Sequence, residues 1–202
     1  TYRILAGAKG KELSTPDYEC DNFFNLLLPP VRTEANPYSE AAGSSLEGEV
    51  AERVLRETGV DRGICLVLGS GDGRLAWEIA ARSRLQVIGV DTSARAVEEA
   101  RKLAYKAGVY GARLKYYQVD SLSKLPFTGH FANLVVSAGM LSKGRCEGSA
   151  SELFRILRPD GGIAYLGQPA ELKPTLTKTR LASWLKRGKV KFECVERDGS
   201  WA

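Results

Sequence analysis

The sequence is poor in the residues from which metal and redox sites are usually built. Its 202 residues include one histidine and four cysteines, which are Cys20, Cys65, Cys146 and Cys194. No two cysteines form a C-x-x-C pair, so neither a zinc site nor a dithiol motif is predicted. Reduced thiols are typical of a reducing compartment. We therefore expect a cytoplasmic protein that binds no metal.

Long apolar runs are also missing. No stretch approaches the roughly 18 to 20 apolar residues of a membrane helix. Residues 1–10 lack the basic and then apolar layout of a secretory signal. We expect a soluble domain with no membrane partner. Because the sequence starts at Thr1 and stops at Ala202 directly after a Gly-Ser-Trp run, we also expect it to be part of a longer chain with other domains.

The excess of positive charge is small. Lys and Arg number 29 against 24 Asp and Glu, a formal net charge of +5. The basic residues are scattered, and their densest run, residues 178–191, is typical of the solvated face of a helix. Nucleic-acid binding usually needs a concentrated basic patch. The composition therefore favours a small-molecule partner over nucleic acid, and it leaves the oligomeric state open.

Strand and helix patterns alternate along most of the chain. Residues 1–40 show no clear period and are expected to form an N-terminal arm or lid, whereas residues 41–202 are expected to form one domain. Capping boxes at Ser44-x-x-Glu47 and Ser149-x-x-Glu152 mark two helix starts. Apolar strands are expected at residues 63–68, 86–90, 114–119, 132–137 and 163–167, with a last helix at 175–186 and a last strand at 190–195. Such alternation predicts an α/β fold: a doubly wound, mostly parallel sheet with helices on both faces.

A glycine-rich loop follows the first of these strands. Its spacing is Gly69-x-Gly71-x-Gly73, which allows a sharp turn and a close approach to a ligand. Asp91 and Asp120 follow the next two strands, and the carboxyl ends of parallel strands form one crevice. Dinucleotides and S-adenosylmethionine are both held by such a loop together with an acid on the ribose. A dinucleotide fingerprint has a third glycine where this chain has Arg74, so the spacing favours S-adenosylmethionine.

These motifs resemble those of class I S-adenosylmethionine-dependent methyltransferases, over about residues 44–168. The first motif is Leu66-Val67-Leu68-Gly69-Ser70-Gly71-Asp72-Gly73, and later ones are Val87 to Ser93, Tyr117 to Ser121, Leu134 to Ser137 and Glu152 to Gly162. The resemblance implies a Rossmann-like fold in which Asp91 binds the ribose, Asp120 meets the adenine amino group, and Ser121 or Leu122 lines the ring. The implied cofactor-binding residues are Gly69, Ser70, Gly71, Asp72, Gly73, Asp91, Thr92, Asp120, Ser121, Leu122 and Ser137.

The chain departs from the family pattern in four places, one of which is Ser70, where cysteine is common. Val67 replaces the usual acid of the first strand, and Asn133 replaces the acid often found before the fourth. The family usually ends in an antiparallel hairpin, of which only residues 190–195 and an Asp-Gly turn are visible. We favour a hairpin cut short, while the alternative is that residues 2–5 supply an edge strand. The flanks, residues 4–13 and 197–201, are faintly similar to quinoprotein-like β-propellers, which implies a larger propeller protein.

The resemblance implies an enzyme that transfers a methyl group by in-line displacement to a small-molecule acceptor. The sequence identifies no catalytic residue. It lacks the Asn-Pro-Pro-Tyr tetrad and the Pro-Cys nucleophile of some methyltransferases, and His130 is expected on the amino side of its strand, away from the crevice. Tyr18, Phe23 and Phe24 are candidates to cover the cofactor. Two alternatives stay open: a non-catalytic S-adenosylmethionine-binding or interaction module, and a nicotinamide-dependent oxidoreductase.

Overall fold

The computed structural model describes residues 2–6, 36–38, 46–168, 175–189 and 195–196, the first and last of these ranges as backbone only. Helices and strands alternate through these residues as expected. The strands are β1 (Tyr2–Ala6), β2 (Ile64–Leu68), β3 (Gln86–Asp91), β4 (Leu114–Gln118), β5 (Leu134–Ser137), β6 (Gly162–Leu166) and β7 (Val195–Glu196). The helices are α2 (Leu46–Thr58), α3 (Arg74–Arg82), α4 (Ala94–Lys106), α5 (Ala138–Lys143), α6 (Ala150–Ile156) and α7 (Lys178–Arg187).

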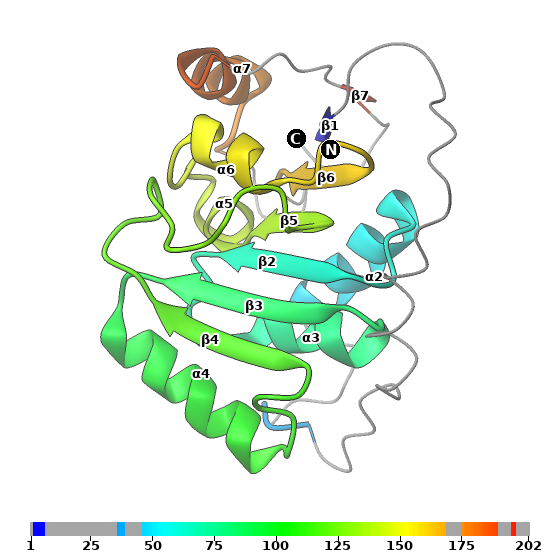
Figure 1. Cartoon of the computed structure of the whole chain (residues 1–202), viewed down its shortest axis with the longest axis vertical. Coiled ribbons are helices and arrows are strands. Elements are labelled where there is room, and N and C mark those ends of the chain that lie inside the picture. The colour runs from blue at the N-terminus through cyan, green and yellow to red at the C-terminus, as the bar shows by residue number, and fades with distance from the viewer. Residues whose placement is uncertain (1, 7–35, 39–45, 169–174, 190–194, 197–202) are drawn as a thin grey trace.

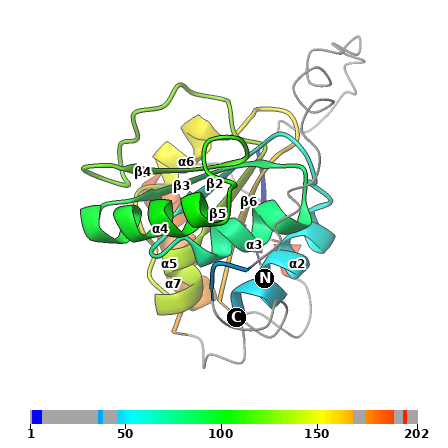
Figure 2. The same cartoon turned by 90° about the horizontal axis from the view of Figure 1, so that it is seen from below.

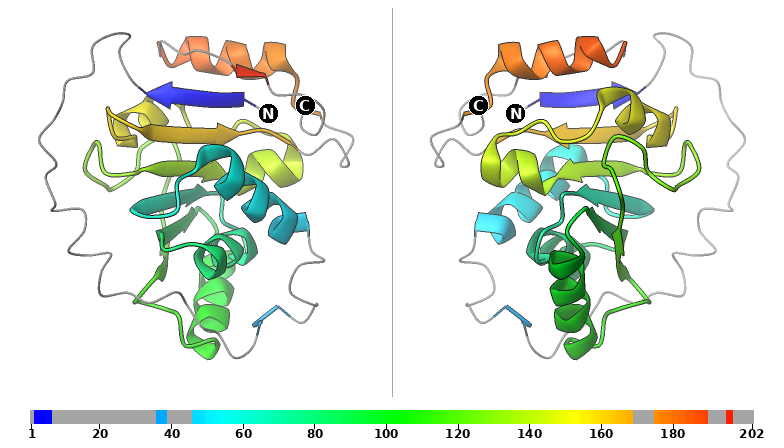
Figure 3. Two further views of the ribbon diagram at one scale, coloured as in Figure 1. Left: turned by 90° about the vertical axis from the view of Figure 1, so that its right-hand side faces the viewer. Right: turned by 90° about the vertical axis from the view of Figure 1, so that its left-hand side faces the viewer.

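The seven strands form one sheet in the order β4-β3-β2-β5-β6-β1-β7 (Figure 1). Strands β4, β3, β2, β5 and β6 pair in parallel, which confirms the predicted doubly wound sheet. The sheet twists strongly, as right-handed strands require: β4 lies across the view in Figure 1, whereas β1 is seen at full length only in Figure 3. The order changes direction at β2, so the glycine loop that follows β2 lies at the topological switch point.

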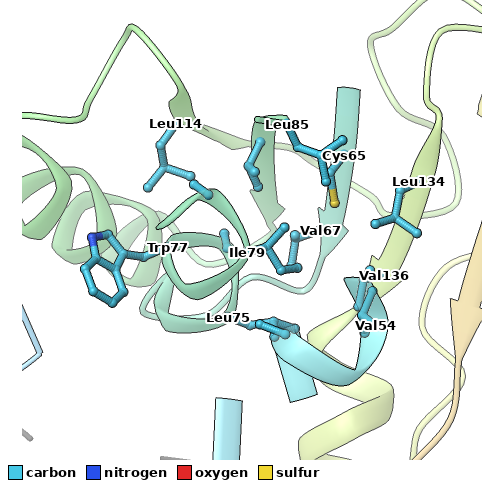
Figure 4. Packing of buried hydrophobic residues seen from close by; sticks show 14 of the residues in the cluster. Val54, Cys65, Val67, Leu75, Trp77, Ile79, Leu85, Leu114, Leu134 and Val136 are labelled. Carbon is cyan, nitrogen blue, oxygen red and sulfur yellow. The ribbon is translucent and has the colours of Figure 1, made fainter. Parts of the chain in front are cut away.

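Alternate residues of β2 supply two separate hydrophobic cores. Cys65 and Val67 face the core under α2, α3 and α4, and Leu66 and Leu68 face the core under α6 and α7. All four side chains are at most 1% exposed. Figure 4 shows Val67 beside Ile79 of α3 in the first core, and Figure 2 shows α6 on the opposite side of the sheet from α2 and α3. Helices therefore cover both faces, which explains why the central strand β2 is apolar at every position.

The antiparallel strand of the sheet comes from the N-terminal segment. Strand β1 lies between β6 and β7 and pairs antiparallel with both, with Ile4 opposite Ala164 and Arg3 opposite Val195. The hairpin cut short that we favoured stays a prediction, because the structure shows only that residues 2–6 fill this position in the sheet. The alternative was closer, although β1 is an inner strand and not an edge. Residues 190–194 of the expected last strand lie outside the described residues.

Local signals set most helix ends. The Ser93 hydroxyl accepts a hydrogen bond from the Ala96 amide and caps α4, and Gly59, with φ of +68°, follows α2. Helix α7 begins at Lys178, later than expected, because Thr177 caps it. Helix α5 was not predicted, since its six residues are too few to show a period. The capping box proposed at Ser44 lies outside the described residues.

Candidate cofactor site

A cavity of about 410 Å³ lies at the carboxyl ends of the parallel strands. This volume is within the range of about 300–1,000 Å³ that is usual for small-molecule sites. Its walls come from the glycine loop, the start of α2, the turn after β3, helix α5 and the loop that follows α5. The lining residues are Leu46, Glu47, Val50, Gly69, Ser70, Gly71, Asp72, Arg74, Leu75, Asp91, Thr92, Ser93, Leu122, Ala138, Gly139, Leu141, Ser142, Lys143 and Glu147.

The glycine loop needs its glycines for two physical reasons. Gly69, Gly71 and Gly73 have φ angles of +59°, +56° and +87°, a region that L side chains rarely adopt. A Cβ on Gly71 would meet nothing within 4 Å, so the space above this residue is open to a ligand. The every-second-residue spacing seen in the sequence is therefore a run of left-handed glycines beside the cavity.

Asp91 ties the end of β3 to the glycine loop. Its Oδ2 accepts a hydrogen bond from the Gly71 amide at 2.9 Å, and its Oδ1 accepts one from the Ser93 amide at 2.8 Å. Each carboxylate oxygen has about two acceptor positions, so each keeps capacity for one more donor. Asp91 lines the cavity and is suited to accept from a vicinal pair of hydroxyls, such as those of a ribose.

The structure brings seven of the implied cofactor residues to the cavity: Gly69, Ser70, Gly71, Asp72, Asp91, Thr92 and Leu122. Gly73, Asp120, Ser121 and Ser137 do not line it. Asp120 is exposed, and the Ser121 hydroxyl accepts from the Ser123 amide. Ser137 is 1% exposed, and its hydroxyl caps α5 by accepting from the Met140 amide. Contact with a cofactor stays a prediction for all eleven residues, both the seven that line the cavity and the four that do not.

Two tyrosine hydroxyls donate hydrogen bonds to backbone carbonyls of the glycine loop. The buried Tyr116 hydroxyl donates to the carbonyl of Gly73 at 2.8 Å. The Tyr38 hydroxyl donates to the carbonyl of Asp72, also at 2.8 Å, and its ring packs edge-on against Trp77. Burial raises the pKa of both hydroxyls, so both stay protonated donors. Tyr38 belongs to the segment we expected to be an arm; Tyr18, Phe23 and Phe24 of that segment lie outside the described residues.

Several cavity residues were missed at the level of sequence. In the sequence, Arg74 drew attention only because it occupies the position of the third glycine in a dinucleotide fingerprint. In the structure it lines the cavity, and its guanidinium lies 3.9 Å from the Glu47 carboxylate. Lys143 and Glu147 come from α5 and the loop after it. The signal in the sequence was position, because ligands in such sheets bind where the loops follow the carboxyl ends of the parallel strands.

The carboxylate of Glu147 lies directly on the backbone of the site. A Cβ on Gly69 or on Gly139 would overlap it, so these two glycines make the space it occupies. Its Oε2 is buried and has no hydrogen-bond partner within the described residues. Burial raises the pKa of this carboxyl and the Asp91 charge raises it further, whereas Lys143 and Arg145 act in the opposite direction.

The remaining sequence candidates lie elsewhere. His130 Nδ1 contacts the Leu157 carbonyl at 3.1 Å, and this residue is not among those that line the cavity, as expected from its place before β5. Cys65 is fully buried, and burial raises the pKa of the Cys146 thiol. Within the described ranges no group of three or more metal-ligating side chains is found. The helices described there include none long and apolar enough to cross a bilayer.

Comparisons with known proteins agree with this geometry. Residues 65–161 match a family described as a methyltransferase domain. A provisionally assigned S-adenosyl-L-methionine-dependent methyltransferase of Methanococcus maripaludis is 27% identical, with a TM-score of 0.57 over 74% of this chain and 67% of that one. No curated protein sequence matches the chain.

Two more distant structures share the fold alone. A provisionally assigned sarcosine dimethylglycine methyltransferase of Galdieria sulphuraria is 16% identical, with a TM-score of 0.55 over 70% of this chain and 60% of that one. The [4+2]-cyclase SpnF is 18% identical, with a TM-score of 0.53 over 83% of this chain and 71% of that one.

The site suits the cofactor that this family uses. S-adenosylmethionine needs acceptors for its ribose hydroxyls, a backbone it can approach closely and a counter-charge for its cationic groups. Asp91, the open glycine loop and Glu147 lie on the wall of one cavity and have the chemistry to meet these three needs. From its sheet order, its loop and the match over residues 65–161, the chain has the Rossmann-like fold of class I S-adenosylmethionine-dependent methyltransferases.

Proposed function

We propose that the chain binds S-adenosylmethionine in the cavity beside the glycine loop and transfers its methyl group to a small-molecule acceptor. The observation that carries the proposal is Asp91, which is held between Gly71 and Ser93 and faces the cavity with acceptor capacity to spare. The bound cofactor would supply a methyl group already activated by its sulfonium. The chain's own contribution is then to bind and align, since in-line transfer needs the reacting atoms about 3 Å apart.

The charges on the cavity wall support a small acceptor. Among the lining residues the cations are Arg74 and Lys143. Arg74 lies 3.9 Å from Glu47, and Lys143 is close enough to Glu147 to lower the pKa of its carboxyl. A polyanion such as nucleic acid is normally held by an excess of one charge sign. Four acidic residues line the same cavity, so its wall carries more negative than positive groups and disfavours a polyanionic acceptor.

Calorimetry with S-adenosylhomocysteine tests the site. The Asp91→Ala substitution should weaken binding by about 2 to 4 kcal/mol, because two hydrogen bonds to a charged group are lost. Asp160→Ala is the matched control, since Asp160 is exposed in the turn before β6, at the opposite end of the sheet. No binding by the wild type, or equal binding by wild type and Asp91→Ala, contradicts the proposal. Conversion of S-adenosylmethionine to S-adenosylhomocysteine with any acceptor would exclude a module that only binds.

A further inference from the structure

The Glu147 carboxylate has no role in the fold that the described contacts reveal. Its Oε2 is buried without a hydrogen-bond partner, although the residue as a whole is half-buried, and a buried polar atom that lacks a partner lowers stability. Structural carboxylates in the same domain are paired: Glu152, for example, accepts from the Leu125 amide and from Arg155. An orphaned carboxylate on a cavity wall is therefore better explained by a ligand than by folding.

The position of Glu147 shows which part of a ligand it would meet. In the sheet, β3 and β5 flank β2 on opposite sides, and the glycine loop follows β2. Asp91 ends β3, whereas Glu147 lies against Gly139 at the start of α5, directly after β5. The two carboxylates thus lie on opposite sides of the loop. A cofactor whose ribose is held by Asp91 would present its other polar end on the side of Glu147.

From this arrangement we propose that Glu147 binds the α-ammonium group at the methionine end of S-adenosylmethionine. The inference rests on the proposed function. The ammonium carries three N–H donors and a full positive charge, so it can supply the hydrogen bond that the buried Oε2 lacks; the sulfonium has no N–H to donate. Glu147 is a binding residue in this assignment and takes no proton from the acceptor. Burial raises the pKa of its carboxyl overall, Lys143 and Arg145 oppose this rise, and a bound ammonium would favour the ionised form further.

Two ligands that differ only at this end test the assignment by calorimetry. S-adenosylhomocysteine carries the ammonium, whereas 5′-methylthioadenosine keeps the nucleoside and the thioether but lacks the amino-acid group. Glu147→Gln should weaken S-adenosylhomocysteine binding about 10- to 150-fold, the loss expected for one charged hydrogen bond. The affinity of the Glu147→Gln variant for 5′-methylthioadenosine should equal that of the wild type. This result would also show that the variant is folded. Asp160→Asn, a matched loss of one exposed charge, should change neither affinity.

Three results would overturn the assignment, and they are distinguishable. Equal binding of S-adenosylhomocysteine by Glu147→Gln and wild type would remove Glu147 from the cofactor site and leave the proposed function standing. An equal loss for both ligands would mean that Glu147 supports the shape of the cavity and does not contact the ammonium. A wild type that binds neither ligand would overturn the proposed function together with this assignment.

Discussion

At the scale of single residues, Gly73 shows how a cofactor loop depends on the strand beneath it. Its φ of +87° would be strained for a residue with an L side chain. Its carbonyl accepts a hydrogen bond from the hydroxyl of Tyr116 in β4. A Cβ at this position would lie 2.5 Å from that hydroxyl oxygen and 2.6 Å from the ring. The loop is thus pressed against the sheet, and only glycine satisfies both the backbone angle and the space.

The Gly73→Ala variant should therefore be strongly destabilised. The left-handed backbone alone costs about 1 to 3 kcal/mol, and overpacking against Tyr116 adds about 1 to 3 kcal/mol. Gly108→Ala is the matched control, because Gly108 has φ of +71° but a methyl group there would meet nothing within 4 Å. Urea unfolding of both variants measures the difference. If both variants lose the same unfolding free energy, the Tyr116 side chain moves away from the added methyl group with no loss of stability.

At the scale of elements, Glu152 joins α6 to the loop after β4. Its side chain does not complete the capping box that we predicted: the Ser149 hydroxyl accepts from the Glu152 amide, but the Glu152 carboxylate turns to the Leu125 amide and to Arg155. Arg155 also donates to the carbonyl of Phe127. The segment between β4 and β5 forms no helix, so these bonds fix its course. Leu122 of the same segment lines the cavity.

The Glu152→Gln variant should lose stability in a pH-dependent way. The bond from Arg155 lowers the pKa of the Glu152 carboxyl, so the folded state favours its ionised form. Its stabilisation is complete above the unfolded pKa of about 4.3 and is lost as the pH falls through the lowered value. Urea unfolding should show a deficit of about 1.5 to 3 kcal/mol at pH 7 that narrows below about pH 4.

An exposed acid serves as the control for this pH effect. Glu98→Gln breaks only a surface pair with Lys102, at 3.3 Å, and such pairs contribute little to stability. Its unfolding free energy should stay close to that of the wild type at both pH values. A deficit for Glu152→Gln that is the same at pH 7 and at pH 3.5 would show that its charge is not what stabilises the loop.

At the scale of the whole molecule, the sheet is completed by a strand distant in sequence from its neighbours. Arg3 of β1 is aligned with Tyr165 of β6 on one side and with Val195 of β7 on the other. Strand β1 therefore separates β6 from the edge of the sheet. An unpaired β6 would present a row of free backbone groups, which favours association between molecules.

The Arg3→Pro variant tests the position of β1. Arg3 has a strand on each side, so loss of its N–H removes a ladder bond whichever neighbour accepts it. We expect a loss of about 1 to 3 kcal/mol in unfolding free energy and concentration-dependent association in size-exclusion chromatography. Arg3→Ala keeps the N–H and should behave as the wild type. If Arg3→Pro also matches the wild type, β1 is not an inner strand.

Local patterns in the sequence were sufficient for the parallel sheet and for the glycine loop. The strands around β2 are apolar because both faces are covered, and the glycines at 69, 71 and 73 are needed for their backbone angles. Asp91 could be placed because it lies at the end of a strand that the sequence predicts. Helix α5 was not predicted because it has only six residues. The Glu152 carboxylate was assigned to the capping box, but it accepts a hydrogen bond from the Leu125 amide instead.

By itself, then, the sequence determined the α/β alternation, the loop and the acid at its side, since each depends on residues close together in the chain. Tertiary structure alone decided that Glu147 meets Gly69 and Gly139, that Ser137 and Asp120 do not line the cavity, and that Tyr2–Ala6 enters the sheet between β6 and β7. These facts depend on how the loops run over the carboxyl ends of the parallel strands. They also depend on which segment of the chain pairs with the free edge of β6. Both are contacts between distant segments, and no local period records them.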